Sequence, residues 1–126
     1  MDFFSAQSTT AIAPDAPRID AMEIERLRSS LGEESDAIIQ LFLEETAKRL
    51  ARMGRAMDPG ERELLSREAH SLKSAAATFG CRHLAELARD FEDVAPTIAL
   101  APLAARLSAL GDAYHEVREA LLGKSS

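Results

Sequence analysis

The spacing of apolar residues constrains the fold of this chain more than any other feature. From about residue 19 to the C-terminal region, apolar side chains recur at every third or fourth position. Such spacing lines one face of an α-helix, and no segment shows the strict alternation of a half-buried β-strand. Aromatic residues make up only 5% of the chain, which also disfavours sheets. The sequence therefore predicts an all-α protein.

A short helix is predicted where this periodicity starts. It begins at about Ile19, with Asp20 as its N-cap, and ends at Gly32. Its inward-facing residues are predicted to be Met22, Ile24, Leu27 and Leu31. Residues 1–18 are rich in Ser, Thr, Ala and Pro and have no sustained period, so we expect a flexible leader there.

Four longer helices are predicted over residues 34–57, 60–79, 84–94 and 100–121. Asp58, Pro59 and Gly60 form a turn, with Asp58 as the expected N-cap of the next helix and Pro59 as its first residue. Short connections favour an antiparallel up-down four-helix bundle, with the short additional N-terminal helix covering one end. We expect one domain over residues 19–126.

Composition excludes several classes of function. The formal net charge of −6 disfavours nucleic-acid binding, which needs clustered Lys and Arg, so the expected partner is a protein. Cys81 is the single cysteine, which rules out an internal disulfide and favours a reducing compartment. No apolar run approaches the roughly 18 residues that a membrane span requires. We expect a cytoplasmic monomer, because four helices already close a core.

One histidine is marked by its position on the third long helix. The core stripe of that helix runs through Leu65, Ala69, Leu72, Ala76 and Phe79. At about 100° per residue, His70 lies about 140° from the centre of the stripe and should point outward. Ser74 and Ala77 share this outer face, and Lys73 flanks it within side-chain reach of His70. Such small neighbours favour the close approach of a partner.

These residue types suit phosphoryl transfer. Imidazole is largely neutral near pH 7, and its unprotonated nitrogen is a nucleophile. A phosphoryl group brings about −1.5 to −2 charges, which the ammonium group of Lys73 can partly neutralise. Spacing alone leaves open the alternative that His70 is a surface histidine without a role.

The residues around His70 form a recognisable pattern. The segment Ala69-His70-Ser71-Leu72-Lys73-Ser74-Ala75-Ala76-Ala77-Thr78-Phe79-Gly80, followed by Leu84, Leu87 and Glu92, resembles the histidine phosphotransfer (HPt) domain family. The resemblance covers most of the chain after residue 19, including the acidic stretch Phe42-Leu43-Glu44-Glu45-Thr46. It implies that His70 accepts a phosphoryl group and that Lys73 supports it. The family usually has Gly after the lysine, where this chain has Ser74.

The resemblance also implies a pathway. His70 would relay a phosphoryl group between receiver-domain aspartates of response regulators, in a two-component phosphorelay that includes a hybrid sensor histidine kinase. The receiver would supply Mg²⁺, so no cofactor is expected in this chain. Because no Gly-rich nucleotide loop is present, we expect a phosphocarrier without kinase activity of its own. Docking is expected on Ser74, Ala77, Arg67 and Phe42, with Ile38 or Leu41 as further apolar contacts.

Other readings of the sequence have less support. A bundle that binds signalling partners without phosphorylation of His70 remains the main alternative. Carboxylate-bridged metal sites need Glu-x-x-His twice, and only Asp112-x-x-His115 approaches that motif. Cys81 and His83 are two positions apart and would point to opposite sides of a helix. Gly123-Lys124-Ser125 imitates the end of a P-loop, but Arg118 stands where its first Gly belongs.

Overall fold

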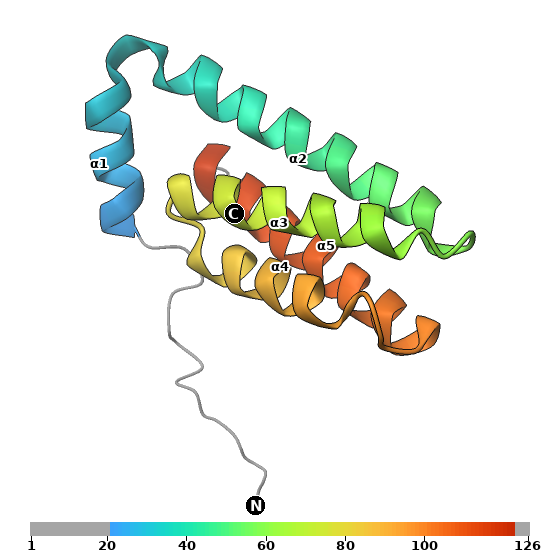
Figure 1. Ribbon diagram of the computed structural model, residues 1–126. Helices are drawn as coiled ribbons and strands as arrows, with labels where there is room; N and C mark the ends of the chain where they lie inside the picture. Colours follow the sequence, from blue (N-terminus) through green and yellow to red (C-terminus); the bar gives the residue numbers. More distant parts are fainter. Residues whose placement is uncertain (1–20, 123–126) are drawn as a thin grey trace, which may run out of the picture.

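The structure is a computed structural model that describes residues 21–122. The predicted leader and Asp20 lie outside the described residues. Within them every regular element is helical, which confirms the all-α class (Figure 1). The elements are α1 (Ala21–Leu31), a short 3-10 helix (Gly32–Glu34), α2 (Ser35–Met57), α3 (Arg62–Thr78), α4 (Arg82–Val94) and α5 (Leu100–Leu122). Over residues 21–122, no helix is both long and apolar enough to cross a bilayer.

Helices α2 to α5 form the predicted antiparallel four-helix bundle. α2 packs on α3, α3 on α4, α4 on α5, and α5 returns to α2, so the four helices close a ring around one core. The short helix α1 lies across one end of the bundle, next to the start of α2 (Figure 1). The short additional N-terminal helix was therefore predicted correctly in kind and place.

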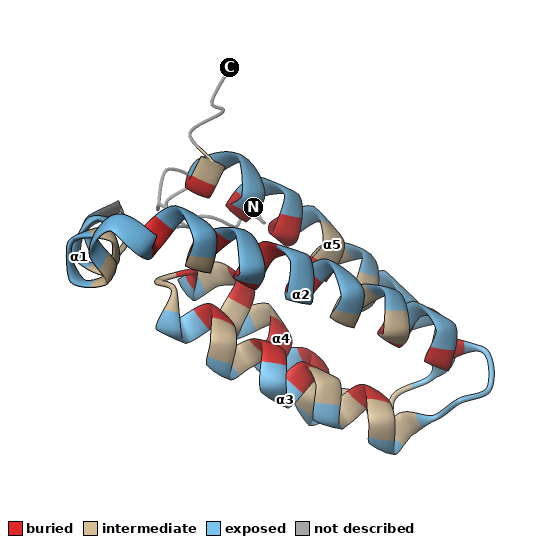
Figure 2. Ribbon diagram, turned by 90° about the horizontal axis from the view of Figure 1, so that it is seen from above, coloured by how far each residue is buried: buried red, intermediate tan, exposed pale blue. Residues whose placement is uncertain are grey.

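Buried side chains line the inner faces of the bundle helices (Figure 2). The largest that are fully buried include Phe91, Ile39, Leu43, Met53, Leu65, Leu72, Leu84, Leu103, Leu110 and Leu121. α3 and α4 share the most extensive close backbone approach in the bundle. Both helices bury small side chains completely: Ala69 and Ala76 of α3 and Ala88 of α4.

Two polar contacts fix how the helices are joined. The Tyr114 hydroxyl donates to the carbonyl oxygen of Leu43 at 3.1 Å and ties α5 to α2 inside the core. The Arg62 guanidinium donates to the carbonyl oxygens of Ala95 and Ile98, each at 2.7 Å. Since those carbonyls belong to the connection after α4, Arg62 joins the start of α3 to it and satisfies acceptors that a helix end leaves open.

The predicted start of the third long helix is wrong. Asp58, Pro59 and Gly60 all belong to the turn, and the N-cap of α3 is Glu61, with no side-chain capping hydrogen bond. Gly60 has φ 70°, in the left-handed region, so the chain cannot be helical before it has passed this residue. Asp58 instead occupies the C-cap of α2. The predicted stops at Gly32 and Gly80 are confirmed, with φ of 70° and 73°.

Two residues of the apolar stripes are exposed, and one of them, Met22, was predicted to face the core. Met22 in the first turn of α1 is 68% exposed, and Leu100 at the start of α5 is also exposed. Both continue a correct helical stripe, but each stands at the end of its helix. Ile24, Leu27 and Leu31 of α1 are half-buried.

Gly54 and Gly60 both have space for a side chain, but only Gly60 has a positive φ. Alanine substitutions at the two positions therefore test the effect of backbone conformation alone. Neither Gly54 in α2 nor Gly60 has an atom within 4 Å of an added Cβ, apart from its own chain neighbours. We expect Gly54→Ala to stabilise the fold by about 0.5–1 kcal/mol, through helix propensity. Gly60→Ala should destabilise it by about 1 kcal/mol, because alanine is strained at positive φ. Urea unfolding measures both, and a loss of stability in both variants would contradict this account.

Candidate functional site

His70 lies on the outward face of α3, as predicted. Its side chain is 59% exposed, although Ala69 before it and Leu72 after it are fully buried. The 100° step of the helix turns His70 away from the core, while the two buried neighbours hold its backbone in place. The imidazole is therefore fixed at its base and accessible at its tip.

The imidazole ring is held on one side by an acidic side chain from the next helix. Nδ1 of His70 lies 3.0 Å from Oε2 of Glu92 in α4. Sequence reasoning gave Glu92 no role, although the residue closes the segment on which the family resemblance rests.

Glu92 also holds Lys73. Nζ of Lys73 lies 3.2 Å from Oε1 of Glu92, close enough for an ion pair. Oε1 is buried, and no group in residues 21–122 meets the geometry of a hydrogen bond to it, so the ammonium charge is its main compensation. Partial burial of Glu92 favours the neutral acid, but the contacts with Lys73 and His70 outweigh it and lower the pKa of this carboxyl. Glu92 is therefore an anion near pH 7.

The outer face around His70 is open and built from small side chains. Ser74, Ala77 and Arg67 are all exposed, as their predicted docking role requires. Two turns beyond His70, a shallow hollow of about 320 Å³ opens where α3 ends and α4 begins. The residues that line it are Ala77, Gly80, Arg82 and Ala85.

The prediction that Phe42 belongs to this docking face is wrong. Phe42 is only 6% exposed, and its ring stacks on Phe79 with centroids 4.3 Å apart. It fills the space between α2 and the end of α3. The exposed apolar side chain in this stretch is its neighbour Leu41, at 57%, while Ile38 is half-buried.

A second charged cluster lies on the other side of α3. Glu68 accepts hydrogen bonds from two arginines of α2, Arg49 at 2.6 Å and Arg52 at 3.2 Å. Partial burial favours the neutral form of Glu68, but the hydrogen bond from Arg52 and the charges of both arginines outweigh it and lower the pKa of the carboxyl. This cluster joins α3 to α2, as Glu92 joins α3 to α4.

Comparison with known proteins assigns the chain to a family. A family model described as Hpt domain matches residues 37–121. The chain belongs to the Hpt family. It is thus a histidine phosphotransfer protein. His70 lies within the matched residues, and its role as phosphoryl acceptor stays a prediction.

A solved structure has the same fold as this Hpt domain. The crystal structure of histidine-containing phosphotransfer protein B (HptB) from Pseudomonas aeruginosa PAO1 superposes with a TM-score of 0.80. The match covers 87% of this chain and 96% of that chain, at 22% sequence identity. At this identity the similarity concerns the fold alone. No curated protein sequence matches the chain.

Cys81, His83 and His115 are further side chains of the Hpt domain that carry reactive groups. Burial raises the pKa of the Cys81 thiol to about 12, so the thiol stays protonated. His83 is half-buried, whereas His115 is exposed and its ring lies beside that of Tyr114. In the described part of the chain, no three His, Cys, Asp or Glu residues gather as metal ligands would. The predicted absence of a resident cofactor stays a prediction.

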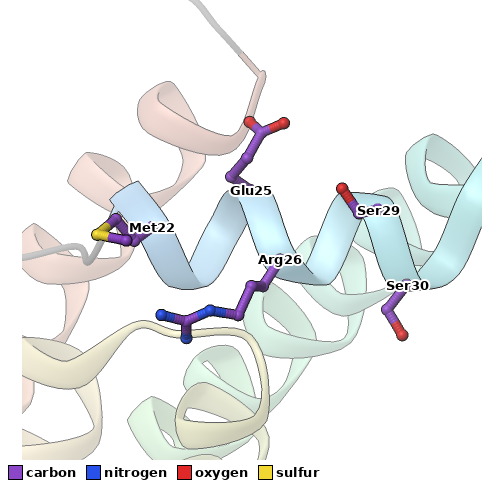
Figure 3. A pocket seen from close by; sticks show the side chains of 5 residues that line it. All are labelled: Met22, Glu25, Arg26, Ser29 and Ser30. Carbon is purple, nitrogen blue, oxygen red and sulfur yellow. The ribbon is translucent and has the colours of Figure 1, made fainter.

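Another hollow, of about 490 Å³, runs along α1 at the end of the bundle. The described residues that line it come from α1 alone: Met22, Glu25, Arg26, Ser29 and Ser30. Figure 3 shows Glu25 and Ser29 on one side of the helix and Arg26 and Ser30 on the other. These side chains bring no nucleophile comparable to His70, so we do not assign the site here.

The Glu68 cluster makes the stability of the bundle depend on pH. Because the pKa of Glu68 is lowered on folding, its contribution is present above the usual glutamate range and lost as pH falls through the folded-state value. We expect Glu68→Gln to destabilise the protein by about 1 kcal/mol at pH 7. The difference from wild type should shrink below about pH 4.

Thermal unfolding across this pH range measures the effect. Glu44 of α2 is exposed, so Glu44→Gln is the control and should change stability by less than about 0.5 kcal/mol. A Glu68→Gln effect that stays constant down to pH 3 would contradict an ionic contribution.

Proposed function

We propose that His70 accepts a phosphoryl group from the aspartate of one receiver domain and passes it to the aspartate of another. The pathway would begin with a hybrid sensor histidine kinase and end at a response regulator. The observation that carries the proposal is the 59% exposed side chain of His70, which shares the carboxylate of Glu92 with a lysine one turn along the same helix. Membership in the Hpt family supports it.

The site supplies a nucleophile and a positive charge. Nε2 of His70 would attack the phosphorus of the aspartyl phosphate, and the carboxylate would leave on the opposite side. Lys73 is 32% exposed and has three donors, so its ammonium can keep its contact with Glu92 and still meet a phosphoryl oxygen. Mg²⁺ and the acidic pocket would belong to the receiver. Since the chain has no Gly-rich nucleotide loop, we infer a phosphocarrier and not a kinase.

The receiver would dock on the face formed by α2 and α3. Ser74 and Ala77 leave room for the partner beside His70, and Arg67 offers a charge to its acidic pocket. The exposed side chain of Leu41 gives the partner an apolar contact at the edge of this face. We expect the protein to act in the cytoplasm, as a monomer.

Substitution of His70 tests the proposal directly. His70→Gln should accept no phosphate from a phosphorylated receiver, while its stability changes by less than about 0.5 kcal/mol because the site is exposed. The readout is an acid-labile, alkali-stable phosphate on the protein. His83→Gln and His115→Gln are the controls and should be labelled like wild type. Absence of labelling in wild type itself would favour a binding module that acts without phosphorylation.

The small outer face provides a second test. Ser74 lies one turn beyond His70, so the side chain of Ser74→Leu should stand between the imidazole and the incoming aspartyl phosphate and block transfer. Because leucine is a better helix former than serine, the variant should unfold at the same temperature or slightly higher. Ser74→Gly should keep transfer near the wild-type rate and cost about 0.5 kcal/mol of stability. Transfer by Ser74→Leu at the wild-type rate would contradict the proposed docking geometry.

A further inference from the structure

Lys73 and Ser74 lie one turn beyond His70 and flank it on opposite sides. At about 100° per residue, Lys73 is turned about 60° from His70 in one direction and Ser74 about 40° in the other. Lys73 is on the side of α4, because its Nζ lies 3.2 Å from Oε1 of Glu92. Ser74 therefore flanks the ring on the side away from α4, where it is exposed. Side chains four positions apart are neighbours on a helix, and the hydroxyl of Ser74 is a hydrogen-bond donor.

The contact with α4 also orients the ring of His70. Nδ1 of His70 lies 3.0 Å from Oε2 of Glu92, so this edge of the ring points toward α4. The two nitrogens of an imidazole are separated by one ring carbon, and their in-plane bonding directions diverge. Nε2 is therefore turned away from α4, toward the flank that carries Ser74.

A phosphoryl group on Nε2 would find only part of the charge it needs on the α4 side. Such a group brings about −1.5 to −2 charges. Partial burial of Glu92 is outweighed by its contacts with Lys73 and His70, so the pKa of this carboxyl is lowered and the group is an anion beside the ring. The ammonium of Lys73 is shared with that anion. The phosphoryl oxygens on the other flank need a donor that does not come from α4.

We propose that the hydroxyl of Ser74 binds the phosphoryl group on His70 and prolongs the life of the phosphohistidine. The hydroxyl donates a hydrogen bond to a phosphoryl oxygen on the flank opposite Lys73. A hydrogen bond to an ionised oxygen is about twice as strong as one between neutral groups. The inference rests on the proposed function and deepens it. Glycine, which the family resemblance leads one to expect at this position, has no such donor, so the bond would distinguish this chain.

The hydrogen bond stabilises the phosphorylated state and not the free histidine. In hydrolysis, a water oxygen forms a bond to phosphorus, the bond from phosphorus to Nε2 breaks, and its electron pair returns to the ring. The protons of the water stay with the phosphate that leaves. In transfer to a receiver, an aspartate carboxylate takes the place of the water. Both reactions start from the stabilised state and move the phosphoryl group away from Ser74, so both become slower.

Ser71 offers a matched control on the same helix. It is exposed, as Ser74 is, but it is turned about 100° from His70, and adjacent residues of a helix do not face each other. Ser71→Ala and Ser74→Ala therefore make the same chemical change, one outside and one within reach of the phosphoryl group. Because alanine is a better helix former than serine, neither change weakens α3. Ser74→Thr keeps the hydroxyl.

The lifetime of the phosphohistidine is measured on full-length protein labelled with phosphoramidate, which needs no receiver. After removal of phosphoramidate, Ser74→Ala should lose its phosphate about threefold faster than wild type at neutral pH. Ser71→Ala and Ser74→Thr should lose it at the wild-type rate. Equal lifetimes in wild type and Ser74→Ala would overturn the inference, and so would an equal loss of lifetime in Ser71→Ala.

Contact with the phosphoryl group is read directly by ³¹P NMR of the same samples. The phosphohistidine resonance should shift in Ser74→Ala and stay in place in Ser71→Ala. A shorter lifetime without a shift of this resonance would contradict a hydrogen bond to a phosphoryl oxygen.

A receiver as donor adds the equilibrium between the two phosphorylated proteins. In Ser74→Ala the equilibrium constant for transfer onto His70 should fall about threefold, while the initial rate onto His70 stays within about twofold of wild type. An unchanged equilibrium would count against the bond. If wild type is labelled by phosphoramidate and by no receiver, the proposed function fails, whereas the lifetimes still decide the role of Ser74. If phosphoramidate does not label His70 either, both fail.

Discussion

The site depends on the close packing of α3 against α4. Both helices bury alanines completely, Ala69 and Ala76 on one and Ala88 on the other, and their backbones approach each other more extensively than those of any other pair in the bundle. A carboxylate on α4 can reach across to an imidazole and an ammonium on α3 because the helices are this close. A larger side chain at any of these alanines would need the helices to separate, and overpacked cores are destabilised as underpacked ones are.

Two carboxylates form ion pairs that join α3 to its two neighbouring helices. Glu68 neutralises arginines on the α2 side, and Glu92 pairs with the lysine on the α4 side. The ridge between them carries His70, with Ser74 and Ala77 beyond it, and these three side chains are exposed. Positively charged side chains therefore lie on both sides of this exposed stripe, while the side chains beyond His70 are small. This arrangement suits an anionic group that arrives from outside and is covered by a partner domain.

The sequence predicted the bundle and the outward position of His70, because both follow from a period of 3.6 residues that each helix carries by itself. The sequence-based prediction failed where the position of a side chain depends on another helix. Phe42 and Leu41 are adjacent, and only the position of Phe79 shows which of them is buried. Glu92 lies 22 positions from His70, and no local pattern gives the rotation of α4 that brings the two together. The turn residues also led to a wrong helix start, because Gly60 has positive φ and α3 begins only after it, not at Pro59.

A phosphoryl carrier has to present its nucleophile to more than one partner, which prevents burial of that side chain. An exposed side chain, however, is free to sample several rotamers, and each partner would then need to select the reactive one. A hydrogen bond to one ring nitrogen limits this freedom without covering the other nitrogen. The acceptor must come from a second helix, since a residue on α3 itself would have to share the exposed face. Glu92 of α4 meets that requirement, because its carboxylate contacts Nδ1 of His70 from the neighbouring helix.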